Sequence, residues 1–368
     1  MTDSSVDERI RTFVRTTPDF VIDSYSDKGG FGHLYFGKRK ITNDKVALKF
    51  YFLDPNETEH FEPRTLQELK NEYIIQVLEA KQLFPDIAYH VTPHISGGDL
   101  SKYIATTVMT THNAVDLIQK VLRAINYLHS DPQNIVHMDL KPQNILIDVS
   151  SKTPYLADFG AVKKIQAGKN YVTKGQYTIP YMPPECVGGE KYYRQSDIYQ
   201  LGIVLFQLLR GFFPVENAAR WLKDKERQQF TKLTPDDKRA FVETHIKKLI
   251  VKGKIMNLDS LPAYVSKDLK IIIKKASHID TSVRFQNCHE FTRALYLHQN
   301  NSHDWWTDPD DDTVYAFCRK KEKYYRIVFR GRQMIVEASL NNIQWRKIFN
   351  ASNTDVAIGH INTYIPNK

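Results

Sequence analysis

The sequence predicts an α+β fold with two lobes and a small C-terminal appendage. Three observations lead to this fold class. Strand-like segments crowd the chain before Asp99, apolar residues with helical spacing dominate from there to about residue 298, and strand-like segments return after Thr313. The 368 residues leave room for about two domains. We therefore expect a β-rich first lobe, a helical second lobe and a small β-rich α+β unit at the end.

The first lobe is expected to contain an antiparallel sheet. Its strand-like segments, rich in β-branched and aromatic residues, are 20–22, 34–38, 45–51, 74–83 and 87–95. Helical spacing interrupts them at 57–70, where Pro63 also lies. Because proline is tolerated only in the first turn of a helix, we expect this helix to be short or kinked.

The second lobe is expected to be mainly helical. Apolar residues keep helical spacing over 115–130, 197–209 and 266–276. Between the last two, residues 214–262 are highly charged, and the run LTPDDKRAF within them is typical of a capped helix start. We interpret this stretch as an insertion that is either a docking element or a solvated pair of helices.

The tail of the chain carries most of its basic charge. The formal net charge is +9, and ten Lys or Arg stand against three acids between Thr313 and Lys368. Strand-like segments at 314–319, 324–330, 334–338 and 343–349 precede a helical segment at 355–365. A small β-β-β(-β)-α unit is the expected result. The acidic stretch 300–312 before it is interpreted as a linker, pinned to the preceding lobe by Trp305 and Trp306.

Basic residues interleaved with aromatic ones in this tail favour a nucleic acid or an acidic protein as partner. Autoregulatory docking and a plain structural role are the alternatives. Elsewhere, composition excludes a membrane protein, because no apolar run reaches the roughly 18 residues that a spanning helix needs. The polar N-terminus lacks a signal peptide, and Cys186, Cys288 and Cys318 show no metal-binding spacing. These features predict a soluble cytoplasmic protein.

The strongest chemical signal is the run HMDLKPQN at 137–144, followed by Asp158-Phe159-Gly160. Phosphoryl transfer to a hydroxyl needs a carboxylate that orients the acceptor, a cation on the moving phosphate and oxygen ligands for magnesium. Asp139 supplies the carboxylate and Lys141 the cation, and Asn144 and Asp158 supply the ligands. Taken alone, the run could also be an ordinary polar turn.

The pattern resembles the catalytic and metal-binding loops of eukaryotic-like (Hanks-type) serine/threonine protein kinases. Further motifs follow in the family's order: a glycine loop at 28–34, the lysine strand at 46–49, a closing motif at 177–185, and the run SDIYQLG. The resemblance implies a bilobal protein-kinase fold at 15–298, with an N-lobe at 15–95 and a C-lobe at 96–298. Around it lie an N-terminal extension (1–14), an acidic linker (299–312) and a small basic domain (313–368).

The resemblance further implies ATP and Mg²⁺ as cofactors, with Mn²⁺ as an alternative ion. The residues expected to bind ATP are Lys28, Gly29, Gly30, Phe31, Gly32, Leu34, Ala47, Lys49, Glu62, Thr92, Pro93, Ile95, Asp99, Leu146 and Asp158. Glu62 is the expected partner of Lys49, with Glu59 and Glu68 as alternatives. Asp27 occupies the first glycine position of the loop, which would place an acid near the phosphates.

The implied reaction is transfer of the ATP γ-phosphate to a protein hydroxyl, with Asp139, Lys141, Asn144 and Thr178 as the catalytic group. Thr178 would bond Asp139 and Lys141, as in serine/threonine kinases. Met138 replaces the arginine that usually gathers a phosphorylated loop (a non-RD kinase), so we expect activity that depends little on that modification. Autophosphorylation is a further expectation from the resemblance. The rival interpretations are a pseudokinase scaffold without transfer and a kinase for small molecules.

Three structural roles are implied as well. Glu185 should pair with Arg284, and Asp197 should hold the backbone of the catalytic loop. An internal column that aligns the lobes should contain His137, Phe159, Leu66 and Val77.

Overall fold

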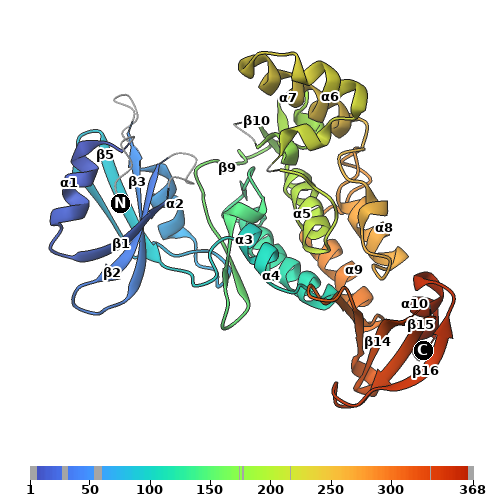
Figure 1. Ribbon diagram of the computed structural model, residues 1–368. Helices are drawn as coiled ribbons and strands as arrows, with labels where there is room; N and C mark the ends of the chain where they lie inside the picture. Colours follow the sequence, from blue (N-terminus) through green and yellow to red (C-terminus); the bar gives the residue numbers. More distant parts are fainter. Residues whose placement is uncertain are drawn as a thin grey trace. The chain divides into compact units, whose positions relative to one another are not determined.

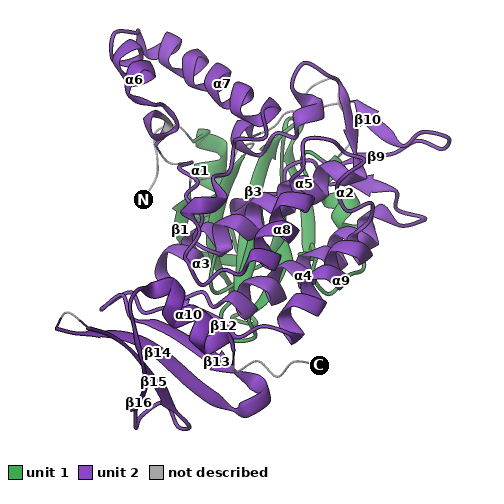
Figure 2. Cartoon of the chain, turned by 90° about the vertical axis from the view of Figure 1, so that its right-hand side faces the viewer, with its two compact units in different colours: residues 1–99, 144–161 green, residues 100–143, 162–368 purple. Residues whose placement is uncertain are grey.

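The computed structural model describes residues 6–26, 32–53, 60–173, 175, 178–215, 217–331 and 333–363. The chain forms two compact units (Figure 2). Unit 1 contains residues 1–99 and 144–161, and unit 2 contains residues 100–143 and 162–368. The expected combination of a sheet-rich region, a helical region and a small β-rich appendage is confirmed (Figure 1).

Unit 1 contains a five-stranded antiparallel sheet in the order β1-β2-β3-β5-β4. Its strands are β1 (Phe20–Ser26), β2 (His33–Arg39), β3 (Lys45–Phe52), β4 (Glu79–Phe84) and β5 (Ile87–Pro93). The strand expected at 74–83 begins only at Glu79. Strands β7 (Ile145–Asp148) and β8 (Thr153–Leu156) form a hairpin. The residues before Glu79 bond to this hairpin, since Ile75 N donates to Leu156 O at 2.9 Å.

The segment that carries Asn144 and Asp158 therefore folds with unit 1. Its backbone is also tied to the end of the sheet region, because Gly97 N donates to Ile147 O and Ile147 N donates to Gly98 O, both at 2.9 Å. The sequence had placed this segment within the helical lobe. Hydrogen bonds between residues distant in sequence decide the assignment, and composition carries no sign of them.

Helix α1 (Glu8–Thr16) belongs to unit 1 and is more than an extension in front of it. Its Ile10 is fully buried in a cluster with Phe50 and Tyr89 of the sheet. Arg9 donates to both carboxylate oxygens of Asp86 at 2.8 Å. The sequence interpreted residues 1–14 as an N-terminal extension, and in the structure α1 packs with the sheet of unit 1.

Helix α2 (Phe61–Glu68) is short, as expected from Pro63, which occupies its first turn. Pro63 and Leu66 are its buried residues, and they hold the helix against the unit. A proline in the first turn removes no intrahelical hydrogen bond. The helix therefore tolerates Pro63 without a kink and still presents Glu62 from the same turn.

Unit 2 is built mainly from helices. They are α3 (Leu100–Thr106), α4 (Thr111–His129), α5 (Arg194–Leu208), α6 (Asp224–Thr231), α7 (Pro235–Val251), α8 (Lys267–Ala276) and α9 (Cys288–Asn300). Helix α5 is buried on almost all sides, which fits its nearly continuous apolar sequence. Two small antiparallel pairs accompany them: β6 (Ile135–Val136) with β9 (Lys163–Lys164), and β10 (Tyr171–Thr173) with β11 (Lys191–Tyr193).

Short 3₁₀ turns complete the connections. They are η1 (Pro142–Asn144), η2 (Ile179–Tyr181), η3 (Pro184–Cys186), η4 (Ala218–Trp221), η5 (Leu258–Ser260) and η6 (Arg319–Lys321). The helix start expected in the charged insertion is present, since Thr234 caps α7 by accepting a hydrogen bond from Asp237 N.

The C-terminal appendage is a five-stranded antiparallel sheet in the order β12-β13-β14-β15-β16, with a helix packed on it. Its elements are β12 (Asp304–Thr307), β13 (Val314–Cys318), β14 (Lys323–Arg330), β15 (Gln333–Ser339), β16 (Arg346–Ala351) and α10 (Thr354–Asn362). Strand β12 lies in the stretch interpreted as a linker, which is therefore partly a sheet strand. The remaining strands and the helix follow the expected order.

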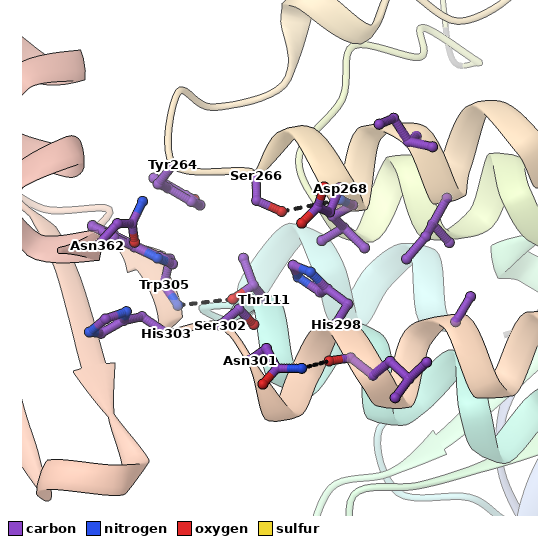
Figure 3. Close-up of a pocket in the computed structure, with 15 residues that line it drawn as sticks. Thr111, Tyr264, Ser266, Asp268, His298, Asn301, Ser302, His303, Trp305 and Asn362 are labelled. Carbon is purple, nitrogen blue, oxygen red and sulfur yellow. Dashed lines mark hydrogen bonds between the residues drawn. The ribbon is translucent and has the colours of Figure 1, made fainter. Parts of the chain in front are cut away.

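Trp305 explains why this polar stretch forms a strand. Its ring is 4% exposed and stacks on Tyr264 with 6.0 Å between the ring centroids. Its backbone N donates to Thr111 Oγ1 at 2.9 Å (Figure 3). The neighbouring Asp304 Oδ1 accepts from His112 N at 2.8 Å. A cavity of about 550 Å³ lies at this junction, beside His298 (Figure 3).

Among the described residues, no helix is long and apolar enough to cross a membrane. In the same part of the chain, Cys186, Cys288 and Cys318 are buried and form no disulfide bond.

Candidate active site

Unit 2 presents a tight polar cluster on the loop between β6 and η1. Lys141 Nζ lies 2.7 Å from Asp139 Oδ2 and donates to Thr178 Oγ1 at 2.7 Å. Thr178 Oγ1 in turn donates to Asp139 Oδ1 at 3.0 Å. The contacts expected of Thr178 are therefore present. Each carboxylate oxygen of Asp139 has a polar partner, so the side chain is held in one orientation.

Asp197, fully buried at the start of α5, holds the backbone in front of Asp139. Its two carboxylate oxygens accept hydrogen bonds from His137 N at 2.9 Å and Met138 N at 3.0 Å. Burial acts to raise the pKa of Asp197, but hydrogen bonds from His129 and Tyr192 keep that pKa below its usual value. A buried carboxylate that stays ionised is a strong acceptor, so the loop is anchored as the sequence predicted.

Gln200, one turn further along α5, is a buried residue that the sequence reasoning missed. Its Oε1 accepts from Leu140 N at 2.9 Å, and its Nε2 donates to Met138 O at 3.1 Å and to Tyr181 O at 3.2 Å. One side chain thus bonds the backbone on both sides of Asp139. The signal was available, because a glutamine within an apolar helical run must find partners when it is buried.

Met138 has a left-handed backbone with φ 72°, which is unfavourable for a non-glycine residue. Its backbone N donates to Asp197 and its backbone O accepts from Gln200, and these two hydrogen bonds hold that conformation. Its side chain is fully buried, and a Cβ built at Gly175 of the activation segment would meet Met138 Cε at 3.6 Å. An apolar methyl group therefore faces the segment at the point where the family usually has an arginine.

Unit 1 presents the second polar cluster, around Lys49. Lys49 Nζ lies 2.9 and 2.8 Å from the two carboxylate oxygens of Glu62 and 3.0 Å from Asp158 Oδ1. Burial acts to lower the pKa of Lys49, but the two carboxylates raise it well above its usual value. The lysine is therefore a fixed cation. The expected pairing with Glu62 is present, and Glu59 lies outside the described residues.

Asp158 and Asn144 are the two candidate metal ligands, and both belong to unit 1. Asp158 has φ 59°, and the next residue, Phe159, donates its backbone N to Glu62 Oε1 at 3.2 Å. Asn144 is buried, and its backbone O accepts from Ala157 N at 2.9 Å. An amide and a carboxylate supply the hard oxygen donors that Mg²⁺ prefers, so the residues fit this ion.

Several residues expected at the nucleotide share one face of the unit 1 sheet. Leu34 pairs with Lys49 across β2 and β3, and Ala47 pairs with Thr92 across β3 and β5. Side chains of directly paired residues lie on the same face, and Ala47 is two residues from Lys49. Pro93 follows Thr92 at the end of β5, Ile95 lies just beyond, and Asp99 forms a single antiparallel bridge with Leu146.

The glycine loop is described only at its end. A Cβ at Gly32 would lie 2.1 Å from Phe50 O, so this position accepts only glycine where β2 approaches β3. The expected residues Lys28, Gly29, Gly30 and Phe31 lie outside the described residues, as does Asp27.

The structural ion pair expected in the helical region is present. Arg284 donates to the two carboxylate oxygens of Glu185 at 2.9 and 2.7 Å and is fully buried. Of the expected internal column, Leu66 and Phe159 are buried in unit 1 and His137 is buried in unit 2. Val77 is only half-buried. The column itself stays a prediction.

Comparison with known proteins agrees with this geometry. The protein kinase domain family matches residues 27–305. The serine/threonine-protein kinase TIO of Arabidopsis thaliana is 29% identical over 64% of this chain and 18% of its own length. The serine/threonine-protein kinase atg1 of Dictyostelium discoideum is 27% identical over 77% of this chain and 40% of its own length.

A bacterial relative, the probable serine/threonine-protein kinase PknB of Lactococcus lactis, is 31% identical over 51% of this chain and 31% of its own length. The chain thus spans less than half the length of each of these three relatives.

Proposed function

The chain belongs to the protein kinase family, and we propose that it transfers the γ-phosphate of ATP to serine or threonine hydroxyls of a protein. The cluster of Asp139, Lys141 and Thr178 is the observation that carries this proposal. It combines a fixed carboxylate, a cation and a hydroxyl within hydrogen-bonding distance. Similarity to proteins named serine/threonine-protein kinases supports the same acceptor class.

In the proposed mechanism, Asp139 orients the substrate hydroxyl and accepts its proton. Lys141 lies on the same carboxylate and offers its ammonium group to the transferring phosphoryl group, whose charge grows in the transition state. Thr178 fixes both side chains, so little reorganisation is needed when substrate binds. Asp197 and Gln200 act on the backbone of the loop and are positioning residues.

We assign the binding of the nucleotide to residues of unit 1. Lys49 would bind the phosphates, with its ammonium group held by Glu62. Asn144 and Asp158 would hold Mg²⁺, or Mn²⁺ in its place, and this ion neutralises phosphate charge when bound. The paired residues Ala47 and Thr92, with Leu146, would contact the adenine.

The surroundings of Met138 support activity that depends little on phosphorylation of the activation segment. A phosphorylated loop is usually gathered by a guanidinium group, and the Met138 methyl group offers no charge. An active enzyme is favoured over the pseudokinase alternative, because Lys49, Asp139, Asn144 and Asp158 keep the residue types that the transfer needs. Three buried cysteines that form no disulfide among the described residues support a reducing compartment such as the cytoplasm.

The proposal is tested by incubating the full chain with γ-labelled MgATP and a basic protein, followed by phosphoamino-acid analysis. Label on serine or threonine of the chain and of the added protein supports a serine/threonine kinase with autophosphorylation. Label on tyrosine alone, or transfer only to small hydroxyl compounds, contradicts the proposed acceptor.

A further inference from the structure

The charged insertion of unit 2 forms a groove of about 1030 Å³. Helices α6 and α7 and the turn η4 surround it, and Figures 1 and 2 show the two helices side by side. Trp221, Leu249 and Phe241 contribute half-buried apolar surface to its lining. Five exposed cations also line it: Arg220, Lys223, Lys248, Lys252 and Lys254.

Two acids in the lining, Glu226 and Asp237, offset only part of this charge and are not paired with the five cations. Glu226 lies 3.3 Å from His245 Nδ1 and accepts from the backbone N of Lys223 at 2.7 Å. Asp237 accepts from Thr234 Oγ1 at 2.7 Å, where it takes part in the cap of α7. Within the described part of the chain, no ion pair joins the five cations to a carboxylate. The groove therefore carries a net positive charge beside the apolar surface of its lining.

The groove is also connected to the segment that carries Thr178. Helix α7 contacts η2 and η3, which directly follow Thr178 in the chain. A row of aromatic rings makes the same link: Tyr181 lies 5.4 Å from Phe213, which lies 5.0 Å from Trp221 between ring centroids. A chain segment bound in the groove would thus lie in the same unit as the acceptor-orienting loop.

We propose that this groove docks an acidic stretch of the protein substrate, separate from the hydroxyl that is phosphorylated. The inference rests on the proposed kinase function. Uncompensated cations favour a negatively charged partner, and such contacts act over distance and weaken with salt. The apolar floor favours a peptide that also carries one or two large apolar side chains, because burying them adds affinity without charge.

The test uses two peptides with the same phosphoacceptor sequence, one of which continues into a tract of Glu and Asp around a leucine. For the full-length chain we expect a KM lower by roughly tenfold for the peptide with the tract, with kcat unchanged and the advantage lost at high salt. The double variant Lys248→Glu/Lys252→Glu should remove this advantage. The matched control, Lys267→Glu/Lys274→Glu, makes the same charge change at exposed positions of α8 outside the groove and should retain it.

Equal KM values for the two peptides with the wild-type chain would overturn the inference, as would equal losses in both double variants. Displacement of the acidic peptide by a polynucleotide but not by a second acidic peptide would assign the groove to nucleic acid and also overturn it. Binding of the fluorescent acidic peptide to the Asp139→Asn variant is measured without catalysis. If the acidic peptide binds to this variant while the wild type transfers no phosphate, the result contradicts the kinase function and leaves the groove assignment standing.

Discussion

The loop that carries Asp139 and the C-terminal sheet lie in the same unit. The sequence predicted individual contacts in the loop, but only the strands and their order in the sheet. In the loop, the contacts of Asp139, Lys141 and Thr178 were expected one by one and are present. In the sheet, alternation of residues predicted the strands and their order but pointed to no particular partner. A reaction demands specific groups at specific places, whereas a strand demands only a pattern, and many binding functions are compatible with one pattern.

The same contrast applies to charge. Lys141 in the loop cluster forms an ion pair with Asp139, and Lys49 in the unit 1 cluster forms one with Glu62. In the sheet, Arg326 and Arg330 are similarly bound to the buried Glu337. Part of the basic charge counted in the tail is therefore satisfied internally. This weakens the argument for a nucleic acid that the sequence alone supported.

The largest effect is expected at the phosphate-binding cluster. Lys49→Met leaves Glu62 and Asp158 without their shared cation, and we expect kcat/KM to fall by about 10²–10³-fold, as for loss of a transition-state donor. Lys45→Met, at an exposed position of the same strand, is the matched control and should be nearly neutral. Steady-state kinetics with MgATP check this, and equal activity of the two variants would refute the assignment of Lys49.

A smaller effect is expected from Gln200→Leu, which keeps the size of the side chain but leaves Leu140 N, Met138 O and Tyr181 O without that partner. We expect kcat to fall by roughly 10- to 100-fold and the free energy of unfolding by about 1–3 kcal/mol. The KM for ATP should stay unchanged, since Gln200 holds the loop through Leu140, Met138 and Tyr181, which all belong to unit 2.

Gln207→Leu is the control, because the one hydrogen bond recorded for the Gln207 side chain among the described residues is the one that it accepts from the Tyr181 hydroxyl. It should keep the wild-type kcat. If Gln200→Leu loses stability but keeps kcat, Gln200 is a structural residue alone.

A still smaller effect is expected in the activation segment. The combined variant Tyr171→Phe, Thr173→Ala and Tyr177→Phe should keep the wild-type kcat, because the Met138 methyl group offers no phosphate-binding charge there. Tyr171 and Thr173 lie on β10, and Tyr177 lies outside the described residues. Loss of activity in a variant whose thermal unfolding is unchanged would show that loop phosphorylation is needed.

The smallest effect on catalysis is expected in the C-terminal sheet. Lys320→Glu/Lys321→Glu lies in the turn η6 and should leave kcat unchanged, while it weakens retention of the full chain on heparin at low salt. Retention that equals the wild type at every salt concentration would remove the acidic-partner proposal for this sheet. A change in kcat would instead make the sheet part of the catalytic machinery.

The sequence predicted most of the fold where local patterns were strong. Helix α5 and strands β2, β3 and β5 follow directly from apolar periodicity. Helix α1 and strand β12 were missed because their segments are short and rich in polar residues, and contacts with residues distant in sequence, including those of Ile10 and Trp305, hold them in place. Gln200 was missed for a related reason, since three of its partners are backbone groups that no motif records.

The most direct test of the central claim compares Asp139→Asn with the wild type in single-turnover transfer from γ-labelled MgATP, with nucleotide binding measured in both. The change removes the proton-accepting carboxylate and preserves the shape of the side chain. We predict equal binding of nucleotide and transfer slower by roughly 10²–10⁴-fold, the usual contribution of a general base. Transfer at the wild-type rate by the variant, or none from a folded wild type that binds MgATP, would contradict the assignment of Asp139 as the catalytic carboxylate.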